Sequence, residues 1–169
     1  MIGFITKAAA ILGLVGIIGL GAVPATVGLA QTKGKDTKDA KAEKAKAKTH
    51  RVAIQVNENR PEVMTLALNN AKNVLEHFKA LGEPVSVEIV TYGPGLHMLR
   101  DDTSTVKQRI AQMALEEPSI SFSACGNTQS NMSKAEQKPI SLIAEAKVVP
   151  SGVIRLMELQ GKGYSYIRP

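Results

Sequence analysis

One cysteine, Cys125, is the residue in this chain of 169 whose type and position most clearly suggest chemistry. The residues before it, 119–124, alternate as in a strand, and the residues after it, 126–128, are typical of a tight turn. A thiol at the end of a strand and before a helix faces the positive end of that helix, which favours the thiolate. Since the thiolate is the nucleophile of sulfur transfer and disulfide exchange, Cys125 is the candidate catalytic residue.

The turn after Cys125 contains residues that could support an anionic sulfur. Gly126 has no side chain and would let a second molecule approach, while Asn127 and Thr128 could donate hydrogen bonds. A second interpretation is that Cys125 is a small apolar filler at the edge of the core. The residues alone leave both interpretations open.

The sequence YGPG and the histidine after it could line the same site. Tyr92, Gly93 and Gly95 belong to this stretch, which predicts a rigid turn and could also present backbone N–H groups to an anion. His97 follows the turn and could act as a base to the thiol, although an exposed histidine on a helix is commoner.

Strand and helix patterns alternate along the chain from residue 50 onwards. Short apolar runs predict strands at 51–57, 84–92, 119–125, within 141–150 and at 164–169. Helices are predicted at 61–81, 104–117 and 151–163, with a helical turn at 96–102 and a weaker helix at 128–138. The alternation predicts a three-layer α/β/α fold with a mostly parallel sheet of about five strands. Such sheets gather ligands and chemistry at the carboxyl ends of their strands, where Cys125 lies.

Asn70 lies on the apolar face predicted for the helix at 61–81. The other residues of this face are Val63, Leu66, Ala67, Val74, Phe78 and Leu81. A buried asparagine must find hydrogen-bond partners, so Asn70 either ties down a loop at a strand end or points into the site. We favour the structural role.

The first 49 residues differ in composition from the rest. An uncharged apolar run at 8–23 is followed by small residues, so residues 1–30 are predicted to be a secretory signal. Residues 31–49 are rich in Lys and Ala without apolar periodicity, which predicts a disordered tether. We expect residues 50–169 to form one domain in the periplasm. The alternative is an uncleaved anchor in the inner membrane, with the domain facing the periplasm.

Charge and composition argue against several classes of partner. The net charge is +6, but seven Lys and three acidic residues lie in the tether, and residues 50–169 carry only +1. With 4% aromatic residues and no Trp, the domain lacks the basic, aromatic face of a nucleic-acid reader. We expect no nucleic acid, and at most weak contact of the tether with an anionic membrane surface. We also predict no cofactor and no metal, because phosphate-loop and zinc motifs are missing and the spacing of His97, Met98 and Met132 is too irregular for copper.

Five segments of the domain carry a resemblance to a known family. They are LALNNAKNV at 66–74, VEIVTYGPGLHML at 87–99, SACGNT at 123–128, VVPSGV at 148–153 and GYSYIRP at 163–169. With them the chain resembles the DsrE/DsrF-like family, which has the YchN-like fold of sulfur-relay proteins, and within it an exported branch with ACGNT. The resemblance implies a compact domain that assembles into trimers or hexamers. It also implies that a cysteine near the end of the third strand, here Cys125, carries a persulfide to a partner thiol.

We therefore expect an exported sulfur carrier or thiol-exchange protein that acts through Cys125. Gly126, Asn127 and the adjacent helix end would stabilise the negative sulfur. Its partners would be further copies of the chain and a thiol-bearing protein. One alternative is a non-catalytic oligomer that binds a small anion or metabolite in a pocket that Cys125 only lines. Another is a redox sensor joined between subunits through Cys125.

Overall fold

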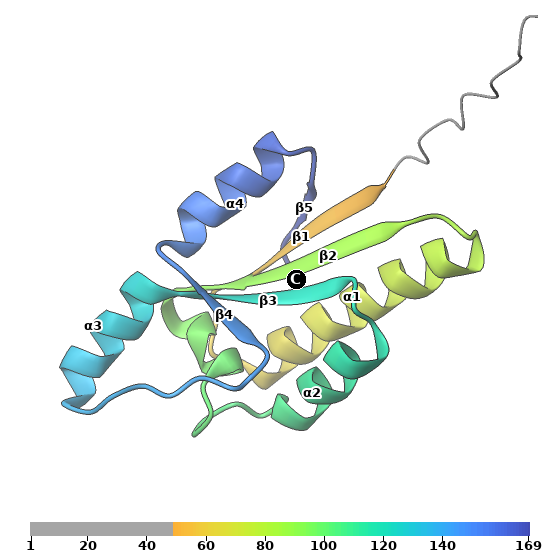
Figure 1. Cartoon of the computed structure of the whole chain (residues 1–169). Helices are drawn as coiled ribbons and strands as arrows, with labels where there is room; N and C mark the ends of the chain where they lie inside the picture. The colour runs from red at the N-terminus through yellow and green to blue at the C-terminus, as the bar shows by residue number, and fades with distance from the viewer. Residues whose placement is uncertain (1–48) are drawn as a thin grey trace, which may run out of the picture. The chain divides into compact units, whose positions relative to one another are not determined.

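The strands of the structure run parallel to one another in a single sheet (Figure 1). The computed structural model describes residues 49–169, so the predictions made for residues 1–48, a signal and most of a tether, lie outside the described residues. The strands are β1 (His50–Val56), β2 (Val85–Thr91), β3 (Ile120–Cys125), β4 (Ala146–Val149) and β5 (Ser165–Ile167). Their spatial order is β4-β3-β2-β1-β5.

Helices cover both faces of the sheet, which confirms the predicted α/β fold class. The helices are α1 (Pro61–Ala80), α2 (Lys107–Glu116), α3 (Gly126–Glu136) and α4 (Gly152–Gly161), with a 3-10 helix, η1, at Gly93–Leu99. Figure 1 shows α1 and α2 on one face of the sheet and α4 on the other, while η1 and α3 directly follow β2 and β3. Within residues 49–169, no helix is both long enough and apolar enough to cross a membrane.

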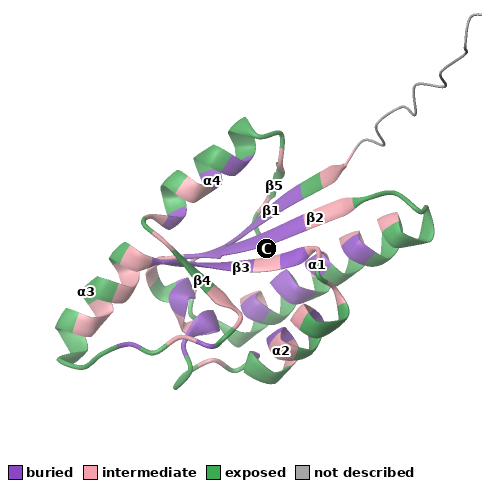
Figure 2. Cartoon of the chain, in the orientation of Figure 1, coloured by how far each residue is buried: buried purple, intermediate pink, exposed green. Residues whose placement is uncertain are grey.

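Alternation along the strands divides the buried residues between two clusters. Ile54 and the residues two positions away from it face the main core, which α1 and α2 cover. Ala53 faces the opposite side and packs in a smaller cluster with Leu156 and Leu159 of α4. Figure 2 shows the buried strands between the helices, whereas α3 has no buried residue. The face under α4 therefore has a thinner apolar cover than the face under α1.

The buried face of α1 differs from the predicted one. Its buried residues are Met64, Ala67, Leu68, Ala71 and Leu75. Leu66, which was assigned to the core, is instead 45% exposed. The prediction failed because α1 carries two neighbouring apolar stripes, and a spacing of three and four residues fits both. Asn70 consequently lies half-buried at the side of the helix.

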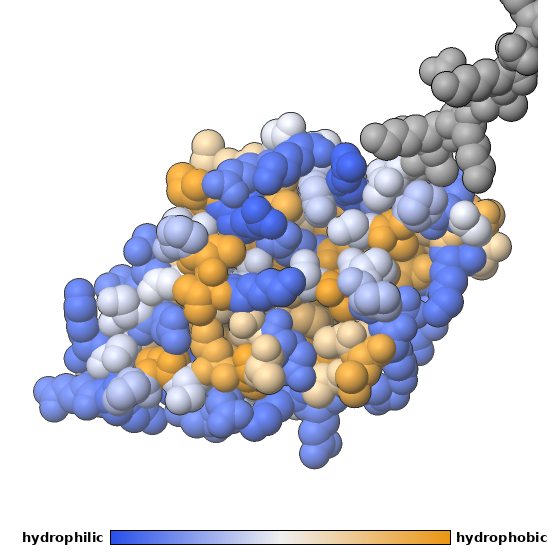
Figure 3. Space-filling view, in the orientation of Figure 1, coloured by the Kyte–Doolittle hydropathy of each residue, from blue (hydrophilic) through white to orange (hydrophobic). Residues whose placement is uncertain are grey.

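Apolar side chains remain on the surface of α4 and β4. In α4, Val153, Ile154 and Met157 are 49%, 52% and 62% exposed, and Val148 of β4 is 58% exposed. Figure 3 shows apolar surface from α4 down towards β4 in the orientation of Figure 1. Since the inner side of α4 is apolar as well, this helix is apolar on most of its circumference.

Candidate functional site

Cys125 lies where two helices begin. It is the last residue of β3, it directly precedes α3, and it is 5% exposed. Its neighbour on β4 is Val149, and the chain turns from there into α4, which begins at Gly152. The parallel pairing of β3 with β4 therefore brings the N-termini of α3 and α4 to one thiol.

Polar groups at both helix starts lower the pKa of the Cys125 thiol. Burial alone raises the pKa of the Cys125 thiol, but the Thr128 hydroxyl and the backbone N–H groups of Gly152, Thr128 and Asn127 outweigh burial and hold this pKa below its ordinary value. The backbone N–H of Asn127 also donates to the carbonyl oxygen of Pro150 at 3.2 Å, so this N–H is shared between that oxygen and the thiol. The arrangement favours the thiolate, the reactive form of the residue.

Thr128 connects the sulfur to the turn after β2. Its Oγ1 accepts a hydrogen bond from the N–H of Gly93 at 2.9 Å. A hydroxyl group has a single proton, and since Gly93 already donates to this oxygen, the proton of Thr128 is left for the sulfur. Gly93 adopts a φ of +52°, a left-handed conformation that glycine reaches without strain. The YGPG turn thus supplies an N–H group that acts on Thr128 and only through it on the anion.

Two glycines beside the sulfur are required by close packing. A Cβ atom on Gly152 would lie 2.9 Å from the Cβ atom of Tyr92, so only glycine lets the start of α4 come this near. A Cβ atom on Gly126 would lie 3.2 Å from Cγ1 of Val148 and 3.3 Å from the carbonyl oxygen of Val149. The missing side chain of Gly126 would therefore point towards β4.

Tyr92 and Gly95 hold the turn against β1. The N–H of Tyr92 donates to the carbonyl oxygen of Val56 at 3.2 Å. A Cβ atom on Gly95 would lie 2.2 Å from the same oxygen, so this position has no room for a side chain. Both residues shape the site without contributing a donor to the sulfur.

An open depression of about 430 Å³ adjoins the donors. It is lined by Asn59, Gly93, Pro94, His97, Thr128, Asn131, Met132 and Ala135. It shares Gly93 and Thr128 with the surroundings of Cys125. Gly93, His97 and Thr128 of this lining were predicted from the sequence, whereas Asn59 and Asn131, which come from separate segments, were not.

His97 belongs to the depression and not to the group of donors around the sulfur. Its Nδ1 atom lies 2.8 Å from Oγ1 of Thr103. Burial lowers the pKa of the imidazole, and the positive charge of Arg100 lowers it further. A role as the base for Cys125 has no support from this geometry.

Two arginine–carboxylate pairs hold the helices around the site, and the sequence analysis missed both. Buried Arg100 forms hydrogen bonds with Glu136 at 2.5 and 2.9 Å and so secures the last turn of α3. Arg155 of α4 forms hydrogen bonds with buried Glu88 of β2 at 2.7 and 2.8 Å. Arg100 and Glu88 are charged residues within apolar segments, which could have indicated buried ion pairs. Their partners could not be identified from the sequence, because they lie 36 and 67 positions away.

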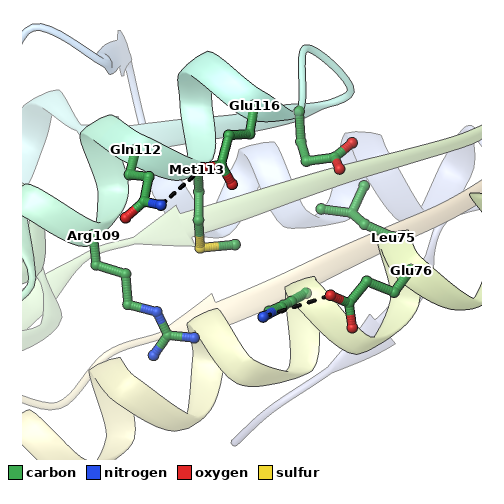
Figure 4. A pocket seen from close by; sticks show the side chains of 8 residues that line it. Leu75, Glu76, Arg109, Gln112, Met113 and Glu116 are labelled. Atoms are coloured by element: carbon green, nitrogen blue, oxygen red, sulfur yellow. Dashed lines mark hydrogen bonds and ion pairs between the residues drawn. The ribbon is translucent and has the colours of Figure 1, made fainter.

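A separate cavity of about 150 Å³ lies between α1 and α2 (Figure 4). It is lined by Lys72, Leu75, Glu76, Arg109, Gln112, Met113, Glu116 and Glu117. Lys72 pairs with Glu76 at 3.5 Å, and Gln112 donates to Glu116 at 2.8 Å, so several of its polar groups are satisfied within their own helices. None of the residues predicted for the site lines this cavity. Among residues 49–169, no three His, Cys, Asp or Glu side chains are grouped so that they could hold a metal ion.

Comparison with known proteins supports the fold and leaves the function open. The chain is similar to a solved structure of a protein of unknown function, MTH1491 from Methanobacterium thermoautotrophicum. The two share 29% sequence identity and superpose with a TM-score of 0.59 over 71% of this chain and 99% of that one. No family model and no curated protein matches the chain.

Proposed function

We propose that this protein is a sulfur carrier of the DsrE/DsrF-like type, in which Cys125 holds sulfur as a persulfide. One observation carries the proposal. The N-termini of α3 and α4 meet at the only cysteine of the chain, and the polar groups there hold the pKa of its thiol below the ordinary value despite burial. A cysteine that served only as apolar filler would not need this set of donors.

The donors support both halves of a sulfur transfer. In the first half, the Cys125 thiolate attacks a sulfur atom of an inorganic polysulfide, the adjacent S–S bond breaks, and the shortened polysulfide leaves with the electron pair. In the second half, a partner thiolate attacks the outer sulfur of the persulfide, and Cys125 leaves as the thiolate. No outside oxidant or reductant is needed. Since a thiol of low pKa is the better leaving group, the same donors favour release.

We further propose that the working form is a homo-oligomer that contacts through the outer face of α4. Val153, Ile154 and Met157 give this face its apolar character. The face begins one residue after Gly152, so a second copy on it would also border the thiol.

A second candidate function is the binding of a small anion or metabolite without chemistry at sulfur. The depression beside Thr128 favours this function, because it is open, and Asn59 and Asn131 could orient a ligand. In that case Cys125 would be part of the scaffold of the pocket.

Intact mass distinguishes these candidates. Residues 31–169 are reduced, exposed to limiting inorganic polysulfide and compared with Cys125→Ser. The carrier predicts that the wild type gains one or more sulfur atoms and the variant gains none. An unmodified wild type would contradict it and favour the binding function.

A further inference from the structure

Glu88 is a buried carboxylate that contacts two elements of the site at once. It lies on β2, on the side of the sheet under α4, and is 4% exposed. Its Oε1 and Oε2 atoms accept from Nε and Nη2 of Arg155 at 2.7 and 2.8 Å. Oε1 also accepts from the hydroxyl of Ser123 on β3 at 2.6 Å.

These three contacts keep the carboxylate ionised in the interior. Burial raises the pKa of Glu88, but the hydrogen bonds from Arg155 and Ser123 and the charge of Arg155 outweigh burial and lower the pKa. A buried ion pair is weak evidence of a contribution to stability, because an apolar pair in its place is often as stable. A bidentate pair does, however, fix a geometry, because the guanidinium binds the carboxylate in one plane.

Both partners of Glu88 lie next to the surroundings of the thiol. Ser123 is two residues before Cys125 and points to the same side of β3. Arg155 belongs to the first turn of α4, where its N–H donates to the carbonyl oxygen of Ser151 at 2.9 Å. That turn contains Gly152, which follows Val149, the partner of Cys125 on β4, by three residues. The backbone N–H of Gly152 also helps to lower the pKa of the thiol.

The apolar contacts of α4 alone would leave this turn less well defined. The buried apolar side chains of α4 are Leu156 and Leu159, which lie in a cluster of four buried residues. Both leucines come after the first turn of the helix. Apolar contacts also restrict the sliding and rotation of a helix on the sheet less than a bidentate ion pair does. Beside the close packing of Gly152 against Tyr92, Glu88 supplies a directional contact between the start of α4 and the sheet.

We infer that Glu88 is a positioning residue for Cys125. By holding Arg155 and Ser123 together, it fixes the start of α4 relative to the end of β3, so that the N–H of Gly152 faces the sulfur. The inference extends the proposed function, since it names the residue that maintains the thiolate on which sulfur transfer depends.

Titration of the thiol in Glu88→Gln and Arg155→Gln tests this role. Thiolate absorbance is measured against pH, and the signal of Cys125→Ser is subtracted, which isolates the only cysteine in the chain. We expect the pKa of Cys125 to rise by about one unit in both variants, or about tenfold less thiolate at a pH below both values. The sign in Glu88→Gln is decisive. If Glu88 acted only through its charge, removal of that negative charge would lower the thiol pKa, whereas loss of positioning raises it.

Two control variants separate positioning from general loosening. Glu117→Gln removes the partner of Lys79 at 2.8 Å, a pair that joins α1 to the end of α2. Ile110→Val weakens the main core under α2 without touching α4. Both should keep the thiol pKa of the wild type. An equal rise in Ile110→Val would overturn the inference, as would an unchanged or lowered pKa in folded Glu88→Gln.

The inference remains testable if Glu88→Gln fails to fold. Arg155 keeps 27% of its side chain exposed, so Arg155→Gln and Arg155→Lys are the milder changes. Lysine retains the charge but not the bidentate pair, so we expect Arg155→Lys to raise the thiol pKa as well. A wild-type pKa in Arg155→Lys would overturn the positioning role. These titrations do not depend on sulfur uptake. The positioning role of Glu88 can therefore hold even if Cys125 takes up no sulfur, and Cys125 can take up sulfur even if Glu88 has no positioning role.

Discussion

At the scale of single residues, the site is a competition between burial and hydrogen bonding at one sulfur atom. Cys125 is buried, which disfavours charge, and is surrounded by donors, which favour it. The sequence predicted Cys125 and the donors that follow it, because a turn of consecutive residues is local. Gly152 was not predicted, because the pairing of β3 with β4 brings this distant segment to Cys125. Glu88 was not predicted either, because its partners Ser123 and Arg155 lie far from it in the sequence.

Removal of the Thr128 hydroxyl should weaken the thiolate. A hydrogen bond to a charged group contributes about 1.5–3 kcal/mol, so Thr128→Val should raise the pKa of Cys125 by about one unit or more. The rate of sulfur uptake, measured against pH, should then reach half of its maximum at a higher pH. Thr128→Ser retains the hydroxyl and is the matched control. Identical pH profiles for the Val and Ser variants would show that the hydroxyl has no part in the site.

At the scale of elements, the packing of two helix starts determines which groups reach the thiol. Gly152 lets α4 lie against Tyr92, and Gly126 lets α3 begin beside β4. The sequence analysis identified both helices. It could not show that their N-termini converge, and it misplaced the buried face of α1 because two apolar stripes competed. Element types follow from periodicity, whereas contacts between elements depend on the topology.

A methyl group at Gly152 should disturb both stability and the site. The Cβ atom of Gly152→Ala would meet Tyr92, and overpacking of this kind costs about 1–3 kcal/mol. We expect a lower urea midpoint together with slower sulfur uptake. Gly161→Ala in the same helix is the control, because no atom lies within 4 Å of its Cβ position. That change should be neutral or stabilising by up to about 1 kcal/mol. Equal losses in the two variants would contradict a special contact at Gly152.

At the scale of the whole molecule, the sheet and its layers were predicted well. Alternating strand and helix patterns left a parallel α/β sheet as the consistent solution. The surface was less predictable. The apolar pattern of α4 is equally consistent with residues buried in the core and with residues exposed on an interface. The structure places Val153, Ile154 and Met157 outside the core, where they support the proposed assembly.

A charge on the outer face of α4 should dissociate the proposed oligomer. Met157→Lys introduces an ammonium group at a position that is 62% exposed in the single chain, so it should leave folding nearly unchanged. Sedimentation should show a smaller species than the wild type. Leu115→Lys, at an apolar residue that is 87% exposed and lies on α2, should leave the assembly intact. An oligomer that persists in Met157→Lys, or a wild type that is already monomeric, would contradict the proposal.

The central claim is that the fold makes Cys125 more reactive towards sulfur than an ordinary thiol, although it buries the residue. The most direct measurement compares the folded protein with the peptide of residues 119–130, which contains the same cysteine. Both react with limiting inorganic polysulfide at neutral pH, and intact mass is followed over time. The lowered pKa predicts faster uptake in the folded protein than in the peptide, because more of the thiol is present as thiolate at neutral pH. Slower uptake than in the peptide, or none, would show that burial dominates and that Cys125 is not a sulfur acceptor.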